Sequence, residues 1–330
     1  MAESLSLPGF VNAHCHAFQR ALRGRGDGGD FWGWRSAMID LAREQDAERV
    51  RATYADVYRE LLAAGYTAVG EFHYLGFGSA LAAVDAADEV GIELVLLYVA
   101  YATEPFAQPS VASYLRDVDE LRRRGITVGV APHSVRACPP DWLEEIGRYA
   151  EREGLVLHVH AAEQPREVED CVSEYGRGPI EHLARHGCVG PHTTLVHATH
   201  ASDVELDLIG EAGARICLCP TTEANLGDGF APIDRICERG IGVCIGSDSN
   251  IRIDPLEELR ELEGTARRLT LRRNVISLDR LLCFGADEGA GALGLEQWGD
   301  VEVDLEHPSL RGADDVFQAL VFGCGADVFA

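Results

Sequence analysis

Residues 8–16 read PGFVNAHCH, an apolar run that ends in two histidines separated by one residue. Side chains two positions apart in a β-strand point to the same side, so His14 and His16 can face one ion. This pair alone is weak evidence of a metal site, because histidines occur at that spacing by chance. Whether the pair indicates a metal site depends on which side chains the other predicted strands carry at their carboxyl ends.

The run at 9–12 is the first of eight short apolar segments that alternate with longer amphipathic ones. This alternation predicts parallel βα units, and eight of them close an α/β barrel of the (β/α)8 TIM type. An open doubly wound sheet is the alternative, but it normally carries a glycine-rich loop after its first strand, and HCHAFQ stands there instead. The predicted strands are 9–12, 68–72, 94–100, 127–131, 156–160, 194–197, 215–218 and 242–246, and the helices predicted between them include 52–64, 79–90, 113–124, 141–153 and 203–211.

Polar side chains follow three more of these predicted strands. His160 ends one strand, His197 ends the next, and Asp248 comes two residues after the last. The carboxyl ends of the strands form the catalytic face of an α/β barrel. Histidines that only fill the core would occur in mid-strand as often as at strand ends, so the shared placement favours a functional site.

The sequence therefore predicts a metal site made of His14, His16, His160 and Asp248. Three imidazoles and one carboxylate suit Zn²⁺ or Fe²⁺, and we expect one such ion per chain. Such an ion lowers the pKa of bound water from about 15.7 to ~7, which makes a hydrolytic enzyme the natural expectation. Glu163 lies three residues after His160 and is the candidate proton carrier. The alternative for Glu163 is a solvated carboxylate on a loop.

The composition of the chain excludes several classes of function. The chain has 330 residues and a net charge of −25, and every one of its 29 basic residues is arginine. A chain this acidic is not expected to bind nucleic acid through its general surface charge, and without lysine it has no Schiff-base chemistry and no P-loop lysine. The ten cysteines form no C-x-x-C pair, which favours buried thiols in a reducing compartment. With no signal-peptide pattern and no run long enough to span a bilayer, the protein is expected to be cytoplasmic, without a membrane partner.

The strings PGFVNAHCH, HVHAAEQ, LVHATH and GSDSN, in that order, resemble the amidohydrolase superfamily. Within it, HCHAFQRAL, DFWGWRSAMI, EFHYL and APHSVRA most resemble the formimidoylglutamate deiminases of histidine degradation. The resemblance covers residues 8–293. It implies a mononuclear zinc site on the four residues named above and hydrolysis of N-formimidoyl-L-glutamate to N-formyl-L-glutamate and ammonia. It also implies that Glu163, with help from His197 and Asp248, transfers protons.

The same resemblance implies a substrate site that holds a small dicarboxylate, formed by Gln19, Arg35, Tyr74, His133 and Arg136. Arginine side chains suit this task, because a guanidinium binds a carboxylate through two parallel hydrogen bonds. Arg35 lies in the first predicted loop and Arg136 follows the fourth predicted strand, so both can reach the barrel mouth. Tyr74 and His133 have an alternative as packing groups behind the site.

Members of the family usually build a small β-sandwich from segments on both sides of the barrel. Here the first barrel strand begins at residue 9, and the segment GALGLEQWGDVEVDLEHPSLRG is shorter than usual. We therefore expect residues 1–296 to form the barrel and residues 297–330 a shortened remnant of the sandwich region, which is absent or vestigial. Apolar surface left open on that flank favours association, so a homodimer is the candidate assembly.

Two other functions compete with the deiminase. A different deaminase of the superfamily, acting on a nucleobase-like ring, would carry the same metal site but would not need two arginines for two carboxylates. A catalytically silent homologue would keep the fold and lose the activity, although all predicted ligands and Glu163 are present.

Overall fold

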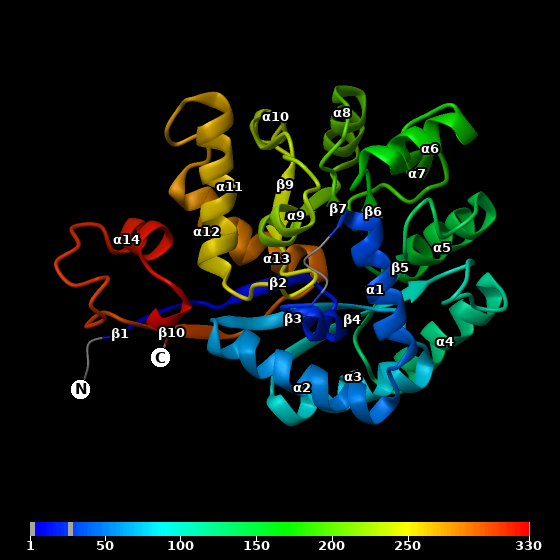
Figure 1. Ribbon diagram of the computed structural model, residues 1–330, viewed down its shortest axis with the longest axis horizontal. Coiled ribbons are helices and arrows are strands. Elements are labelled where there is room, and N and C mark those ends of the chain that lie inside the picture. The colour runs from blue at the N-terminus through cyan, green and yellow to red at the C-terminus, as the bar shows by residue number, and fades with distance from the viewer. Residues whose placement is uncertain (1–3, 26–28, 330) are drawn as a thin grey trace.

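The computed structural model describes residues 4–25 and 29–329. Eight parallel strands follow one another around a barrel in sequence order, with helices outside them (Figure 1). The strands are β2 (Phe10–Cys15), β3 (Tyr66–His73), β4 (Glu93–Ala100), β5 (Val128–Pro132), β6 (Leu157–Ala161), β7 (Thr193–His197), β8 (Arg215–Leu218) and β9 (Gly242–Ile245). Each of the eight predicted strands overlaps one of these, so the predicted (β/α)8 barrel is confirmed.

The barrel closes between its first and last strands at their carboxyl ends. A parallel bridge joins Cys15 to Asp248, where His16 N–H donates to the Asp248 carbonyl at 2.8 Å and Asp248 N–H donates to the His14 carbonyl at 3.0 Å. We call this contact the β2–β9 seam. Because the predicted ligands His14, His16 and Asp248 lie on it, closure of the barrel brings them together.

The helices that alternate with the strands begin at capping residues that the sequence supplies. Ser110 accepts the N–H of Ser113 at the start of α4 (Val111–Arg123), and Ser202 forms a capping box with Glu205 at the start of α8 (Asp203–Ala212). The helices on the barrel wall are α2 (Ala47–Ala63), α3 (Phe77–Val90), α4 (Val111–Arg123), α5 (Pro140–Glu153), α6 (Pro165–Tyr175), α7 (Pro179–Arg185), α8 (Asp203–Ala212), α9 (Pro220–Leu226), α10 (Ile233–Glu238), α11 (Pro255–Thr270) and α12 (Leu278–Gly285).

The connection after β2 is more ordered than a loop. It holds the 3-10 helix η1 (Ala17–Leu22) and helix α1 (Phe31–Arg43), whose first turn is capped by the Asp30 carboxylate. Arg35 therefore stands on a helix and not in an extended loop.

Helix α13 (Asp287–Leu293) closes the amino-terminal end of the barrel. The carbonyl of Ala292 accepts a hydrogen bond from His158 Nε2 at 2.9 Å, and Ala292 belongs to the small apolar cluster inside the barrel. His158 is thus a core histidine bonded to the backbone, two residues below His160 on the same face of β6.

A two-stranded antiparallel sheet lies beside the barrel, toward both ends of the chain (Figure 1). It pairs β1 (Ser4–Pro8) with β10 (Asp300–Asp304), and α14 (Val316–Gly323) packs against α11. Arg260 of α11 donates to the Val321 carbonyl at 3.0 Å. Helix η2 (Ala326–Val328) follows. The division of the chain into two domains after residue 296 stays a prediction. Strands β1 and β10 form a two-stranded flank of the barrel.

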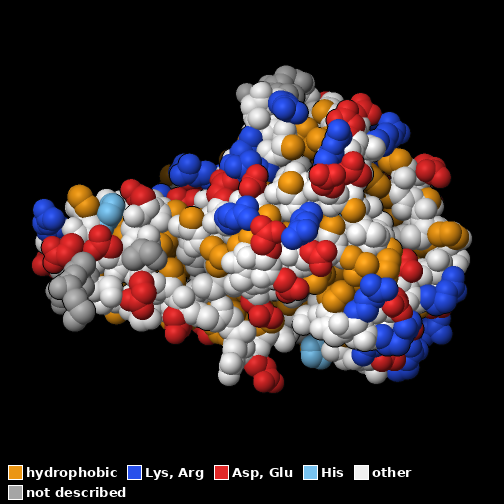
Figure 2. Space-filling view, turned by 90° about the horizontal axis from the view of Figure 1, so that it is seen from below, with side chains coloured by type: hydrophobic (Ala, Val, Ile, Leu, Met, Phe, Trp, Pro, Cys, Tyr) orange, Lys and Arg blue, Asp and Glu red, His pale blue; other side chains and the backbone are white. Residues whose placement is uncertain are grey.

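Arginine and acidic side chains are interspersed on the face shown in Figure 2. Within residues 4–25 and 29–329, no helix is both long and apolar enough to span a bilayer.

Candidate metal centre and active site

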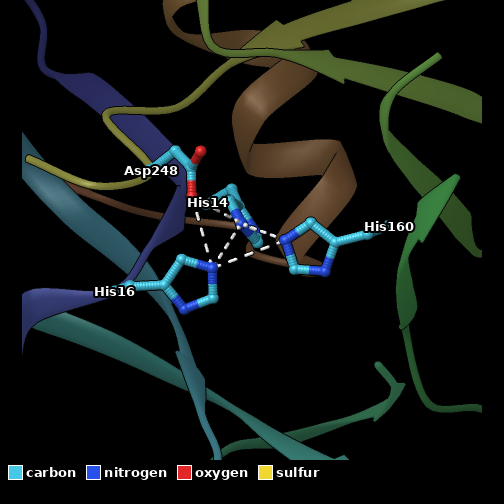
Figure 3. A group of neighbouring side chains, drawn as sticks. All are labelled: His14, His16, His160 and Asp248. Atoms are coloured by element: carbon cyan, nitrogen blue, oxygen red, sulfur yellow. Dashed lines mark hydrogen bonds and ion pairs between the residues drawn. The ribbon is translucent and has the colours of Figure 1, made fainter. Parts of the chain in front are cut away.

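Four buried side chains converge at the carboxyl end of the barrel (Figure 3). The Nε2 atoms of His14 and His16 are 3.1 Å apart, and that of His160 is 3.1 Å from the first and 3.4 Å from the second. Asp248 Oδ1 lies 3.4 Å from His14 Nε2 and 3.3 Å from His16 Nε2. The four residues predicted as ligands are therefore neighbours, and they form a group that could hold a metal ion.

These separations fit a tetrahedral ion. With metal–nitrogen distances of about 2.0–2.1 Å, two ligand atoms of a tetrahedral zinc site lie about 3.3–3.4 Å apart. The five measured separations, 3.1 to 3.4 Å, are close to that value. Three imidazole nitrogens facing one another across such distances cannot all find hydrogen-bond partners among themselves, so the arrangement suits a shared cation.

Backbone carbonyls orient two of the three rings. His16 Nδ1 donates to the Phe72 carbonyl at 3.0 Å, and His160 Nδ1 donates to the His133 carbonyl at 3.1 Å. A hydrogen on Nδ1 leaves the Nε2 lone pair free, which is how proteins prepare histidine to bind a metal.

Burial favours the protonation states that a metal site needs. It lowers the pKa of His14 from 6.5 to about 3, lowers that of His16, and lowers that of His160 well below 6.5. For Asp248, burial acts to raise the pKa, but the hydrogen bond with His14 and the other neighbouring histidines, His197 among them, outweigh it and hold the pKa well below its usual range. The site thus offers three neutral imidazoles and one carboxylate.

Three residues that carry or adjoin the site have backbone angles that L-residues rarely adopt. Ala162, His197 and Asp248 have φ values of 53°, 75° and 44°. His197 is the last residue of β7, and the other two follow β6 and β9. Non-glycine residues pay about 1–3 kcal/mol for such conformations, which persist where the surrounding structure enforces them and cluster at functional sites.

A buried polar network holds the β2–β9 seam, and it was not predicted from the strings NAHCH and GSDSN that contain its residues. Asn12 Nδ2 donates to Ser247 Oγ at 2.7 Å and Ser247 N–H donates back to Asn12 Oδ1 at 3.0 Å. Asn250 Nδ2 donates to the carbonyls of His16 at 3.0 Å and Asp248 at 3.1 Å. The network therefore fixes the backbone on both sides of the metal ligands.

Glu163 and His197, the predicted proton carriers, lie beside the four ligands. Glu163 Oε1 is 3.8 Å from His197 Nε2, which is 3.9 Å from Asp248 Oδ2. Arg136 Nη2 donates to Glu163 Oε2 at 3.0 Å and lies 3.8 Å from Glu167. Arg136 thus also holds the carboxylate of Glu163, a contact that the sequence did not indicate.

The five predicted substrate residues line one cavity with Glu163, His160 and Asp248. The space between these side chains is about 440 Å³, part of which is open to solvent. Tyr74 OH accepts a hydrogen bond from Gln19 Nε2 at 3.0 Å, and His133 packs its ring 4.5 Å from that of Tyr101. Four further lining residues were not predicted from the sequence: Phe31, Met38, Tyr101 and Leu226.

The amidohydrolase family model matches residues 5–304. The chain belongs to the amidohydrolase family. It is 36% identical over 304 residues to formimidoylglutamate deiminase of Pseudomonas aeruginosa, which covers 83% of this chain and 67% of that protein. It is also 28% identical to 5-methylthioadenosine/S-adenosylhomocysteine deaminase of Halobacterium salinarum, over 99% of this chain and 79% of the relative.

Solved structures agree with this assignment. An amidohydrolase from Brucella melitensis superposes with a TM-score of 0.88 at 32% identity, over 98% of this chain and 84% of that one. An adenosine deaminase from Xanthomonas campestris with bound zinc shares the fold, with a TM-score of 0.92 at 24% identity over 99% and 78% of the two chains. The predicted enzyme class, a metal-dependent hydrolase of non-peptide C–N bonds, is confirmed.

Proposed function

We propose that this amidohydrolase converts N-formimidoyl-L-glutamate and water to N-formyl-L-glutamate and ammonia, as a step of histidine degradation, with one zinc ion per chain. The observation that carries the proposal is that Arg35 and Arg136 line the cavity that also contains Glu163 and the metal ligands His160 and Asp248. Two guanidinium groups beside one hydrolytic site match a substrate with two carboxylates.

Two neighbouring side chains support the convergence of these arginines. Burial raises the pKa of Tyr101, and the charges of Arg35 and Arg136 oppose that rise. Burial lowers the pKa of His133 well below 6.5, and the same two charges lower it further. Both arginines therefore act on the same small volume, although they come from α1 and from the segment after β5.

Unpaired polar atoms in the cavity wall are available to the substrate. Arg136 Nε and Gln19 Oε1 are both buried and have no partner among the described residues. The first is a donor for a substrate carboxylate, and the second is an acceptor for an N–H of the formimidoyl group. Leaving such atoms unpaired is costly, so their placement favours a polar ligand.

The residues around the metal ligands account for the reaction. A bound zinc ion would lower the pKa of its water to ~7 and so supply a nucleophile at neutral pH. Glu163 takes one proton from the attacking water and delivers it to the imino nitrogen. His197 Nε2 hydrogen-bonds the attacking oxygen, and Oδ2 of Asp248 accepts the second water proton, which passes to the same nitrogen. The nitrogen then leaves as ammonia, and the carbon keeps the new oxygen as a carbonyl.

A deaminase acting on a nucleobase-like ring is the alternative. The aromatic side chains of Phe31, Trp34 and Tyr101 line the cavity and could stack on a flat ring. The amino group of such a ring could donate to the Gln19 oxygen, but these substrates have at most one carboxylate for the two arginines, so we favour the dicarboxylate.

Ammonia release separates these functions. The zinc-loaded protein is assayed with N-formimidoyl-L-glutamate, adenosine and 5-methylthioadenosine, and its metal content is measured. We expect release from the first substrate only, with loss of activity in a chelator and recovery with zinc. Release from a nucleoside alone would support the ring deaminase, and bound zinc without any release would support the silent homologue; either result contradicts the proposal.

Glu163→Gln tests the proton carrier in the same assay. We expect kcat to fall about 1000-fold with zinc content unchanged, because general acid–base groups contribute about 10²–10⁴-fold. The matched control is Glu169→Gln, an exposed glutamate on α6. If Glu163→Gln kept the turnover of the Glu169→Gln control, Glu163 would not be the proton carrier.

A further inference from the structure

We propose that Glu223 is a positioning residue for His197: its carboxylate holds the imidazole by Nδ1, so that Nε2 is fixed between Glu163 and Asp248. The inference rests on the proposed role of His197 in the hydrolysis. Glu223 stands on α9, the short helix that follows β8, and neither the predicted ligand set nor the predicted substrate site includes it.

The geometry of Glu223 is specific. Its Oε1 lies 3.2 Å from His197 Nδ1 and accepts the N–H of Cys219 at 2.9 Å. All three residues are buried. Since a backbone N–H is always a donor, it fixes Oε1 as an acceptor, and His197 must present Nδ1–H toward it.

Fixing Nδ1 determines where the other nitrogen points. His197 Nε2 is buried without a hydrogen-bond partner in the described part of the chain, 3.8 Å from Glu163 Oε1 and 3.9 Å from Asp248 Oδ2. These distances leave room for an oxygen atom of a reacting molecule between the groups. The His197 backbone has a φ of 75°, so its position depends on surrounding contacts and not on the strand alone.

Glu223 is placed to act through His197 and not on the substrate. The described residues that line the substrate cavity do not include Glu223. It lines a different cleft, of about 510 Å³, between α9, α10 and α11, together with Phe230 and Leu262. A change at Glu223 should therefore alter kcat and leave KM nearly constant.

A second metal ion is the competing explanation, because His197, Cys219 and Glu223 form another group of potential ligands. Hydrogen bonds account for two of the three side chains: Glu223 Oε1 accepts from His197 Nδ1, and also from the backbone N–H of Cys219, while the Cys219 thiol takes no part in these bonds. Burial also raises the pKa of the Cys219 thiol well above its ordinary value, which opposes the thiolate that a metal requires. One ion per chain is therefore expected.

The test compares Glu223→Ala with Glu223→Gln. The Cys219 N–H should keep the glutamine oxygen facing His197, so glutamine retains the acceptor and alanine removes it. We expect kcat to fall about 100-fold in Glu223→Ala and no more than about tenfold in Glu223→Gln, with KM within threefold and zinc content unchanged in both. Glu258→Ala is the matched control, because buried Glu258 also anchors α9, through the Thr221 N–H at 3.0 Å, without touching His197. Its kcat should stay within threefold of wild type.

A spectroscopic readout needs no substrate. In ¹⁵N-histidine-labelled protein, the hydrogen-bonded Nδ1–H of His197, assigned by its loss in His197→Asn, should be visible in wild type and Glu223→Gln and absent in Glu223→Ala. If an alanine variant does not fold, asparagine replaces alanine, since it keeps a polar group but is too short to reach His197.

Three results would overturn the inference: a Glu223→Ala enzyme within threefold of wild type, equal losses in the alanine and glutamine variants, or a second zinc per chain that Glu223→Ala removes. If the wild type released no ammonia from formimidoylglutamate while the Nδ1–H signal still depended on Glu223, the proposed function would fail and the positioning role would stand.

Discussion

Replacing His160 by asparagine should abolish the rise in melting temperature that zinc gives to the protein. The reasoning rests on the three imidazole nitrogens that lie 3.1–3.4 Å apart. Zinc binds them only in the folded chain, so it stabilises that state by about 2.7 kcal/mol when free zinc is 100 times the dissociation constant. Without His160 the remaining groups no longer enclose the ion.

The size of the effect follows from chain length. With an unfolding entropy of about 2.1 cal/mol/K per residue, the 330-residue chain has about 0.7 kcal/mol/K, so zinc at that concentration should raise the melting temperature by about 4 °C. Each further tenfold increase in free zinc adds about 1.4 kcal/mol, or about 2 °C. Scanning calorimetry of chelated and zinc-titrated protein measures both values.

His158→Asn is the matched control, because His158 lies on the same strand and face but bonds the Ala292 carbonyl at 2.9 Å instead of facing the site. Loss of this buried hydrogen bond should lower stability by about 1–3 kcal/mol without zinc, while the zinc-induced rise remains. A zinc-induced rise that survived in His160→Asn, or disappeared in His158→Asn, would refute the ligand assignment.

Three further predictions concern specificity, packing and pH. Arg35→Met should raise KM for formimidoylglutamate at least about tenfold with zinc content unchanged, because it removes a carboxylate partner worth at least ~1.4 kcal/mol; an unchanged KM in steady-state assays would exclude Arg35 from substrate binding. Gly70→Ala should lower the melting temperature by several degrees, because a Cβ there would lie 2.7 Å from the Ala13 carbonyl oxygen and 2.5 Å from Leu293, an overlap that costs about 1–3 kcal/mol; equal melting curves would contradict this. Burial lowers the pKa of His73 from 6.5 to about 4, so as the pH falls His73 is protonated in the unfolded chain before it is protonated in the folded one. About 3 kcal/mol of folding stability that is present above pH 6.5 is therefore lost as the pH falls toward 4. Denaturant unfolding of His73→Gln between pH 7 and 4 should show a smaller loss than wild type.

The strands and the metal ligands could be predicted because their signals are local. Apolar runs with a polar residue at the carboxyl end marked β2, β6, β7 and β9, and a barrel places all those ends on one face. The substrate-binding residues were predicted from the family resemblance and not from the periodicity of the sequence. That they line one cavity supports the proposed function.

Contacts between distant segments could not be predicted in this way. Glu223 follows Pro-Thr-Thr on a helix of seven residues, too short for a periodic pattern, and its partner His197 lies on β7, not on the preceding strand β8. The pairing of Asn12 with Ser247 and of β1 with β10 likewise depends on the closed barrel, because neither partner carries a local mark of the other. Helix α1 was missed because the glycines before it obscured its start.

Because the metal ligands lie on the β2–β9 seam, the metal site can form only late in synthesis of the chain. His14 and His16 leave the ribosome early, whereas Asp248 emerges only after the eighth barrel strand. Until then the nascent barrel has two open edges, on β2 and on the last strand made, and open edges can pair with other chains. Metal capture by the full ligand set thus becomes available only when the last strand joins the first. The ion would then link two strands of the barrel that are synthesised at very different times. Chains interrupted before residue 248 would lack the full ligand set and would keep an exposed strand edge.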